Sequence, residues 1–223
     1  GDCRIDVHDA FHGDNEYAFQ LACGGGHLDV ARELLALDGD RAINVHTNNE
    51  EAFLLACENG HLDVARELLA LDGDRRIDVH VGNERTFRWT CEKGHLDVVR
   101  GLLALTGDRR INVHANREEA FQWACEKGHL AVVRELLALT GDRRINVHAD
   151  NEEAFRLACC NGHVDVVREL LALTGDRRID TRNSKFDRWI ESLSRRPGKS
   201  DINQKLESMI QSHRRRNLWW WWW

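Results

Sequence analysis

A cysteine followed four residues later by a histidine recurs along the chain, and both side chain types can bind zinc. The pairs are Cys23 and His27, Cys57 and His61, Cys91 and His95, Cys125 and His129, and Cys159 and His163. A closed zinc site takes four ligands around one ion, whereas these pairs come one to a repeat and in register. We therefore expect no metal ion and no cofactor, with each cysteine at a small, buried helix position.

A second histidine column falls in the predicted loops and could titrate near neutral pH, which would make binding sensitive to pH. It comprises His46, His80, His114 and His148. The alternative, which we favour, is that these rings bond to neighbouring backbone.

Arginine pairs such as Arg75 and Arg76 recur after each predicted second helix, beginning also at Arg109, Arg143 and Arg177. They could form a phosphate-binding stripe. Arginine also suits the negative helix end, and an adjacent aspartate offsets its charge. Residues 1–180 carry 21 basic and 33 acidic side chains, a net charge of -12, so this part of the chain would repel nucleic acid. We expect no nucleic-acid partner.

Catalytic groups are scarce. Serine is absent from the repeats, and no nucleophile stands uniquely next to a base. Gly198, Lys199 and Ser200 match the end of a phosphate loop, but Leu193 stands where the first glycine is required. We expect no enzyme activity and no catalytic or cofactor-binding residue.

A Gly-His pair recurs every 34 residues through five copies, the first at Gly26 and the last at Gly162. Such a unit cannot bury its own apolar face, so neighbouring copies must stack. Residues 151–161 predict a first helix that Asn151 caps, with Ala154, Phe155, Ala158 and Cys159 on its buried face and a left-handed glycine at its end. Residues 164–173 predict a second helix, and 176–180 an extended connection with a buried Ile179.

The core Ala-Cys-x-x-Gly-His-Leu-Asp-Val, at residues 56–64, resembles the ankyrin repeat. The resemblance spans about residues 1–182 and implies an all-α repeat solenoid in which the turn histidine ties the turn. The Thr-Pro-Leu-His motif is missing, so we expect Asn49, Asn83 and Asn151 to cap the first helices. The connection after the second helix is longer than is usual in the family. Whether the projecting loop keeps the family's usual shape is therefore an open question.

The period ends near Thr181. Residues 185–193 predict a terminal cap, and 201–216 an amphipathic helix with Ile202, Leu206, Met209 and Ile210 on one face. Five tryptophans at 219–223 form a low-complexity tail. We divide the chain into a partial repeat or loop at 1–13, five repeats at 14–182, a helical cap and basic tail at 183–216, and the poly-tryptophan tail at 217–223.

The cysteines that share one repeat position are about 10 Å apart in stacked units, beyond disulfide reach. We expect reduced thiols and a cytoplasmic location, with the nucleus as the alternative and no secretion. No apolar run is long enough for a transmembrane helix. The chain starts inside a repeat at Gly1, so we expect an upstream part.

Positions that differ between copies cluster on the first helix and the loop tip. In ankyrin-like arrays this side is concave and faces the partner. Trp89 and Trp123 share a column with leucines, which favours packing between repeats over a role as binding anchors. The candidate partner-binding residues are Tyr17, Gln20, Glu51, Leu54, Arg85, Arg88, Trp89, Lys93, Glu119, Gln122, Trp123, Lys127, Glu153 and Arg156.

The resemblance implies a non-catalytic protein-protein interaction module that presents a concave surface to a protein partner. Two alternatives stay open. The chain could be the targeting or substrate-recruiting arm of a larger multidomain protein, an enzyme or a ubiquitin-ligase adaptor, or a duplicated array without a fixed partner.

Overall fold

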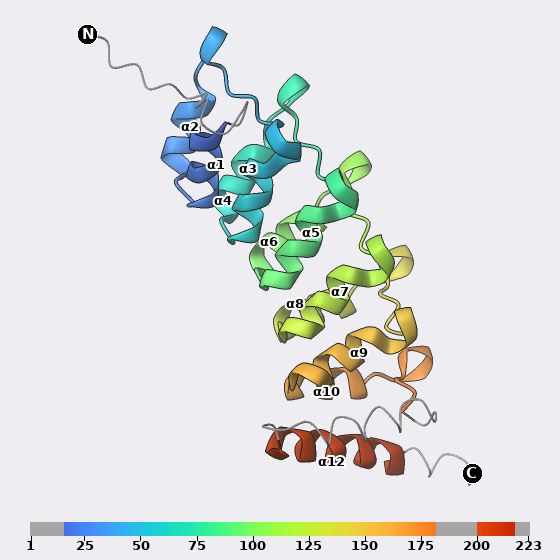
Figure 1. The fold of residues 1–223 in the computed structure, drawn as a ribbon. Helices are drawn as coiled ribbons and strands as arrows, with labels where there is room; N and C mark the ends of the chain where they lie inside the picture. Colours follow the sequence, from blue (N-terminus) through green and yellow to red (C-terminus); the bar gives the residue numbers. More distant parts are fainter. Residues whose placement is uncertain (1–15, 182–199, 217–223) are drawn as a thin grey trace. The chain divides into compact units, whose positions relative to one another are not determined.

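The computed structural model describes residues 16–181 and 200–216 of the chain, and these residues form helices and loops without strands (Figure 1). The chain divides into two compact units, residues 1–115 and 116–223. The predicted all-α fold of repeated helix pairs is confirmed. The predicted cap at 185–193 lies outside the described residues.

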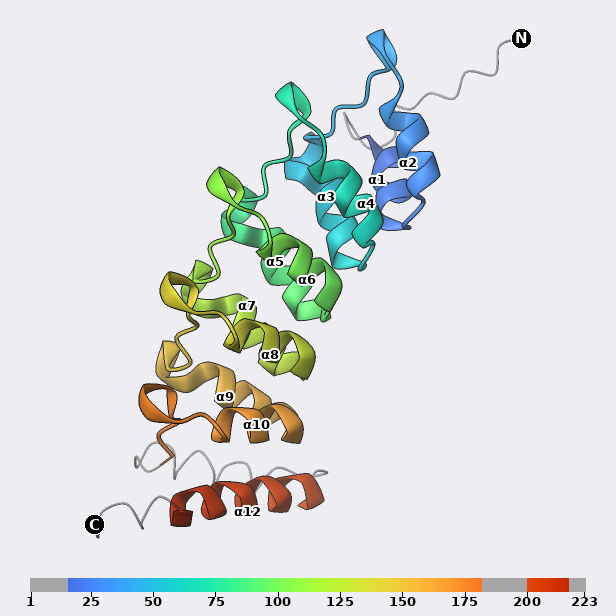
Figure 2. The same cartoon turned by 180° about the vertical axis from the view of Figure 1, so that it is seen from behind.

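The first unit stacks three helix pairs in two layers. Helices α1, α3 and α5 lie side by side in one layer, and α2, α4 and α6 form the other (Figures 1 and 2). A short 3-10 turn follows each second helix. The bounds are α1 Tyr17–Gly24, α2 Leu28–Leu35, α3 Thr47–Glu58, α4 Leu62–Leu69, α5 Val81–Lys93 and α6 Leu96–Leu103, with 3-10 turns at Gly39–Arg41, Gly73–Arg75 and Gly107–Arg109.

The second unit holds two further helix pairs and the last described helix. Helix α10 packs against α8, α9 and α12. The bounds are α7 Ala115–Lys127, α8 Leu130–Leu137, α9 Ala149–Asn161, α10 Val164–Leu171 and α12 Ser200–Arg216, with 3-10 turns at Gly141–Arg143 and Gly175–Arg177.

The core is built from the same repeat positions in each copy. In α9 the predicted face is confirmed, since Ala154, Phe155, Ala158 and Cys159 are buried. The predicted Ile179 is buried as well. Each repeat thus buries one phenylalanine and one cysteine, and the stack forms one core per unit. The phenylalanines are Phe19, Phe53, Phe87, Phe121 and Phe155.

The start of the first helix differs from the prediction. Asn48, Asn49 and Glu50 all have positive φ, between 55° and 63°, and form a left-handed turn before α3 proper begins. A capping residue has extended backbone instead. The prediction that Asn49, Asn83 and Asn151 cap these helices is therefore wrong. Asparagine and glycine occur here because they reach the left-handed region at the lowest cost. The equivalent turns are 82–84, 116–118 and 150–152.

The turn after the first helix is as predicted, because Gly162 has φ +80 and ends α9 in a left-handed conformation. The connection after the second helix is more compact than predicted. Helix α10 ends at Leu171, and Gly175–Arg177 forms a 3-10 turn before the backbone becomes extended at Arg178. Asp176 and Arg177, which were predicted to be extended, therefore belong to the 3-10 turn.

Helix α12 confirms the predicted amphipathic helix. Leu206 and Ile210 are each 1% exposed, while Ile202 is 38% exposed and Met209 half-buried. Asn203 and His213 are buried on the same helix. Arg214 donates a hydrogen bond to the carbonyl of Thr181. These contacts hold α12 on the last described repeat.

Candidate functional site

A glutamate is the last residue of each of these left-handed turns and ties one repeat to the next. Oε1 of Glu50 accepts a hydrogen bond from the backbone N–H of Asp78 at 3.2 Å, and Oε1 of Glu84 accepts one from Asn112 at 3.0 Å. Glu16, Glu118 and Glu152 make the same bond to the residue 28 positions later. The glutamate column is thus a structural part of the stack.

The loop histidines complete this tie. Nδ1 of His46 lies 2.7 Å from Oε1 of Glu50, and its Nε2 lies 2.7 Å from the carbonyl oxygen of Asp74 in the next repeat. His80 and His148 have equivalent partners. The favoured prediction, that these rings bond to neighbouring backbone, is confirmed for these three, and the glutamate is an additional partner that the prediction missed.

The pKa values of two loop histidines shift upward. For His46 the hydrogen bond to Glu50 raises the pKa most, followed by the carbonyl of Asp74. For His80 burial opposes the charged ring, but the carbonyl of Asp108 and the carboxylate of Glu84 outweigh it and raise the pKa. Both ring nitrogens face acceptors, and only the charged imidazolium can donate to both.

The turn histidines bind the preceding repeat. Nε2 of His61 lies 3.0 Å from the carbonyl oxygen of Gly24, and Nε2 of His163 lies 2.7 Å from that of Glu126. Gly60 has φ +82, and a Cβ atom there would lie 2.6 Å from Nδ1 of His95. The close approach of ring and glycine explains why these two residues recur together.

The arginine pairs are also used between repeats. Arg75 donates two hydrogen bonds of 3.2 Å to the carbonyl of Leu35, at the end of α2. Arg76 forms a bidentate pair with Asp108 at 2.7 and 2.8 Å, which raises the pKa of Arg76. Arg144 and Asp176 repeat this pair. These contacts engage Arg75, Arg76 and Arg144 in joining repeats, which favours the structural role over a phosphate-binding stripe.

The cysteine column is buried and chemically quiet. The described cysteines are free thiols, and burial raises the pKa of Cys23 to about 12 and that of Cys57 further. Among the cysteines of the described residues, only the half-buried Cys160 departs from the column. Within 16–181 and 200–216, no three metal-binding side chains gather in one place. Cys57 and His61 therefore serve packing and the repeat-to-repeat tie.

The first-helix face of the first unit carries a cluster of candidate residues. The guanidinium of Arg85 lies 4.6 Å from the centre of the Trp89 ring and 3.6 Å from Oε2 of Glu51. Lys93 forms an ion pair of 3.0 Å with Glu58. We call Glu51, Arg85, Trp89 and Lys93 the first-unit cluster. Tyr17, 40% exposed, lies on α1 of the same layer.

Three candidate residues lie inside the fold. Leu54 is 1% exposed, Gln20 7% and Arg88 9%. Arg88 donates to the carbonyls of Gly82 and Asn83, which belong to the left-handed turn. These side chains offer little contact area to a partner, so the expectation that they lie on an open surface is wrong for them.

The first-helix face of the second unit presents the remaining candidates. Gln122 donates a hydrogen bond of 2.8 Å to the carbonyl of Arg117, and Arg156 pairs with Glu153 at 2.8 Å. Lys127 pairs with Glu126 at 3.2 Å. Glu119 and Trp123 are half-buried. Each of these pairs lies within one helix or its turn.

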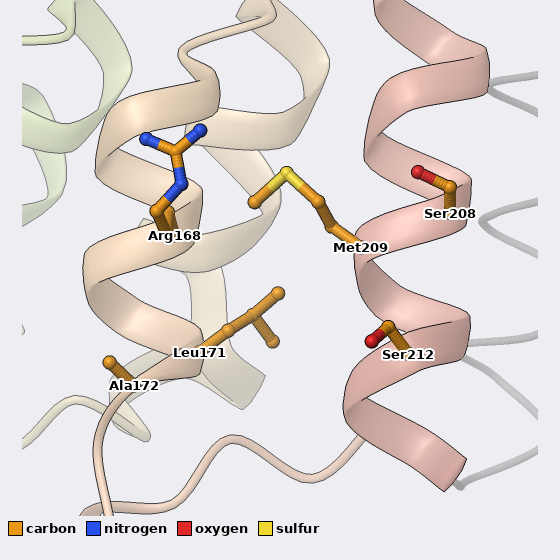
Figure 3. A pocket seen from close by; sticks show the side chains of 6 residues that line it. All are labelled: Arg168, Leu171, Ala172, Ser208, Met209 and Ser212. Atoms are coloured by element: carbon orange, nitrogen blue, oxygen red, sulfur yellow. The ribbon is translucent and has the colours of Figure 1, made fainter. Parts of the chain in front are cut away.

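Two hollows were not predicted from the sequence. One lies between α4 and α6. The other has a volume of about 450 Å³ and lies between α10 and α12, where Leu171 and Met209 point toward each other (Figure 3). Arg168 lines the second hollow and pairs with Asp165 at 2.6 Å. Neither hollow could be found from the repeat pattern, because each lies at a place where the sequence departs from that pattern.

The fold and its ties define a class of protein, a stack of helix pairs in which polar contacts join neighbouring repeats. A family model of ankyrin repeats (3 copies) matches residues 1–82 and 87–183. The chain belongs to the ankyrin repeat family, whose repeats generally mediate protein-protein interaction. No curated protein matches the chain significantly. The helices that the structure describes include none that is long and apolar enough to cross a membrane.

Proposed function

We propose that the chain is a non-catalytic protein-binding module that recognises a protein partner with its first-helix faces. The observation that carries this proposal is that the polar side chains repeated in every copy and those that vary between copies have different roles. The polar residues repeated in every copy bind the neighbouring repeat, as Glu84 and Arg75 do. Those that change between copies, as Glu51 and Arg85 do, are half-exposed on the first helices.

The first-unit cluster suits recognition because its cation is held in place before a partner arrives. Arg85 lies on the face of Trp89 and close to Glu51, so its long side chain has less freedom to lose on binding. Tryptophan and arginine are also the residue types most enriched among binding hot spots. A partner surface with a carboxylate near an apolar side chain would match this cluster.

Charge and thiol chemistry support the remaining parts of the proposal. The net charge of -12 over residues 1–180 disfavours nucleic acid. Free, buried cysteines suit a reducing compartment, so we propose the cytoplasm, with the nucleus as the alternative.

The test is affinity capture from a lysate of the cells that make the protein, with four full-length baits in parallel, namely wild type and three variants. The Arg85→Ala and Trp89→Ala variants remove the held cation and its platform. Arg41→Ala removes one positive charge from an exposed loop residue and serves as the matched control. We expect a protein that wild type and Arg41→Ala capture and the two cluster variants lose. Equal capture by all baits would refute the proposed face.

A further inference from the structure

The hollow between α4 and α6 lies in the second-helix layer of the first unit and has a volume of about 360 Å³. Leu62 and Leu69 line it from α4, and Val98 and Leu105 line it from α6 and the residues after it. We call it the α4–α6 hollow. Its walls are mainly apolar, and Arg66 and Gly101 are the exceptions among its lining residues.

Gly101 stands where every other second helix has a glutamate, at Glu33, Glu67, Glu135 and Glu169. Two of these glutamates bind the arginine 35 residues earlier. Arg32 pairs with Glu67 at 2.8 Å, and Arg134 pairs with Glu169 at 2.8 Å. The same register would pair Arg66 with residue 101, where α6 has no side chain to offer.

Arg66 is exposed, and within the described part of the chain its guanidinium makes no hydrogen bond or ion pair. A glycine inside a helix also costs about 1 kcal/mol relative to alanine. The third repeat therefore loses helix stability and a cross-repeat pair, and the result is an apolar hollow beside a cation without its carboxylate.

We propose that the α4–α6 hollow binds a segment of a protein partner that carries a glutamate or aspartate next to a large apolar side chain. The carboxylate takes the place of the missing glutamate on Arg66, and the apolar side chain covers Leu62 and Leu69. Charge complementarity identifies the occupant, because Arg32 and Arg134 show which group an arginine at this position binds. This surface lies in the other helix layer from the first-unit cluster and is independent of it.

The test selects binders from a displayed library of random 16-residue peptides on the full-length chain. Gly101→Glu is the decisive variant, because it fills the hollow with the array's own carboxylate. A Cβ at residue 101 would lie 3.2 Å from Cδ1 of Leu62, a methyl at the end of a flexible side chain. Leu28 and Leu130 occupy the equivalent place beside Glu67 and Glu169, so the variant should fold. Its melting temperature should be at least that of wild type.

We expect the enriched peptides to share an acidic residue next to Leu, Ile or Phe, and to bind Gly101→Glu and Arg66→Gln at least about tenfold more weakly than wild type. Arg85→Ala, in the first-helix layer, should leave this binding unchanged. That result would stand even if the function proposed above failed.

Peptides without an acidic residue, equal binding by Gly101→Glu, or no enrichment at all would each overturn the proposal. Sodium decanoate provides the remaining arm. If decanoate binds wild type and loses binding in Gly101→Glu while no peptide is enriched, the occupant is a fatty acid and the proposed protein segment is wrong.

Discussion

Nδ1 of His80 lies 2.7 Å from Oε1 of Glu84, and the same carboxylate oxygen accepts the backbone N–H of Asn112 in the next repeat. Nε2 of His80 reaches the carbonyl of Asp108. One histidine and one glutamate thus connect a loop, the helix that follows it and the next loop. The interaction is a cross-repeat hydrogen-bond network whose strength depends on the charge of the ring.

Stability should therefore depend on pH through these rings. The pKa of His46 and that of His80 lie above their ordinary value of 6.5 in the folded chain. The stabilisation from the charged rings is complete below pH 6.5 and is lost as the pH rises through the folded values. We expect the urea midpoint of wild type to fall between about pH 6 and about pH 8.

The His46→Gln and His80→Gln double variant isolates this effect, because it keeps every other titrating group. Its urea midpoint should vary less over the same range. Each histidine side chain is 39% exposed, so the difference should be small for one ring and larger for the pair. Parallel curves for the two proteins would show that these rings do not titrate as inferred.

Loss of a tying glutamate should be costly. Glu84→Ala leaves the backbone N–H of Asn112 without its acceptor, and we expect a loss of about 1.5–3 kcal/mol in the free energy of unfolding. Glu84→Gln should lose less, because the amide oxygen still accepts. Glu33→Ala on α2 removes an exposed glutamate and should stay within about 0.5 kcal/mol of wild type. Urea denaturation compares the three.

Two glycines separate backbone strain from steric contact. Gly73 has φ +56 with nothing within 4 Å of a Cβ position, so Gly73→Ala should cost about 1 kcal/mol through backbone conformation alone. Gly60→Ala adds a clash with the His95 ring and should cost at least about twice as much. Thermal unfolding of the two variants measures the difference. Equal losses would mean that the ring moves aside without penalty.

Thiol reactivity should follow burial. Among the cysteines that the structure describes, Cys160 is half-buried, whereas Cys23 and Cys57 are buried and burial raises their pKa. Iodoacetamide at about pH 8 should therefore alkylate Cys160 in the folded chain well before the buried thiols. Peptide mapping by mass spectrometry gives the order. Early alkylation of Cys57 would indicate that the stack opens locally.

Much of the fold could be predicted because each position of the repeat occurs five times in the sequence. The apolar spacing of Phe155 and Cys159, the turn at Gly162 and the helix after it all follow from local rules, and the structure confirms them. The amphipathic pattern of residues 201–216 was sufficient for α12. Helical periodicity is local, so one copy of the repeat already contains it.

The backbone bond of the loop histidines was predicted, but the glutamate and arginine ties were not, because each of these joins residues about one repeat apart. Asn49 is of a residue type that often caps helices, and only its φ of +59 shows that it belongs to a left-handed turn. Leu54 varies in the sequence like a surface residue, yet neighbouring helices bury it. Variation between copies reports freedom to change, and it does not by itself report exposure.

The spacing of the ties also bears on how the array can evolve. Loss of one 34-residue unit by unequal recombination would present His46 with the carbonyl of Asp108 in place of that of Asp74, and the contact would form again. The same event would bring Arg32 against Gly101 in place of Glu67. We therefore expect gene lengths to change by whole units without loss of the fold. A hollow such as that beside Gly101 would then be carried along with its repeat, as an inherited module.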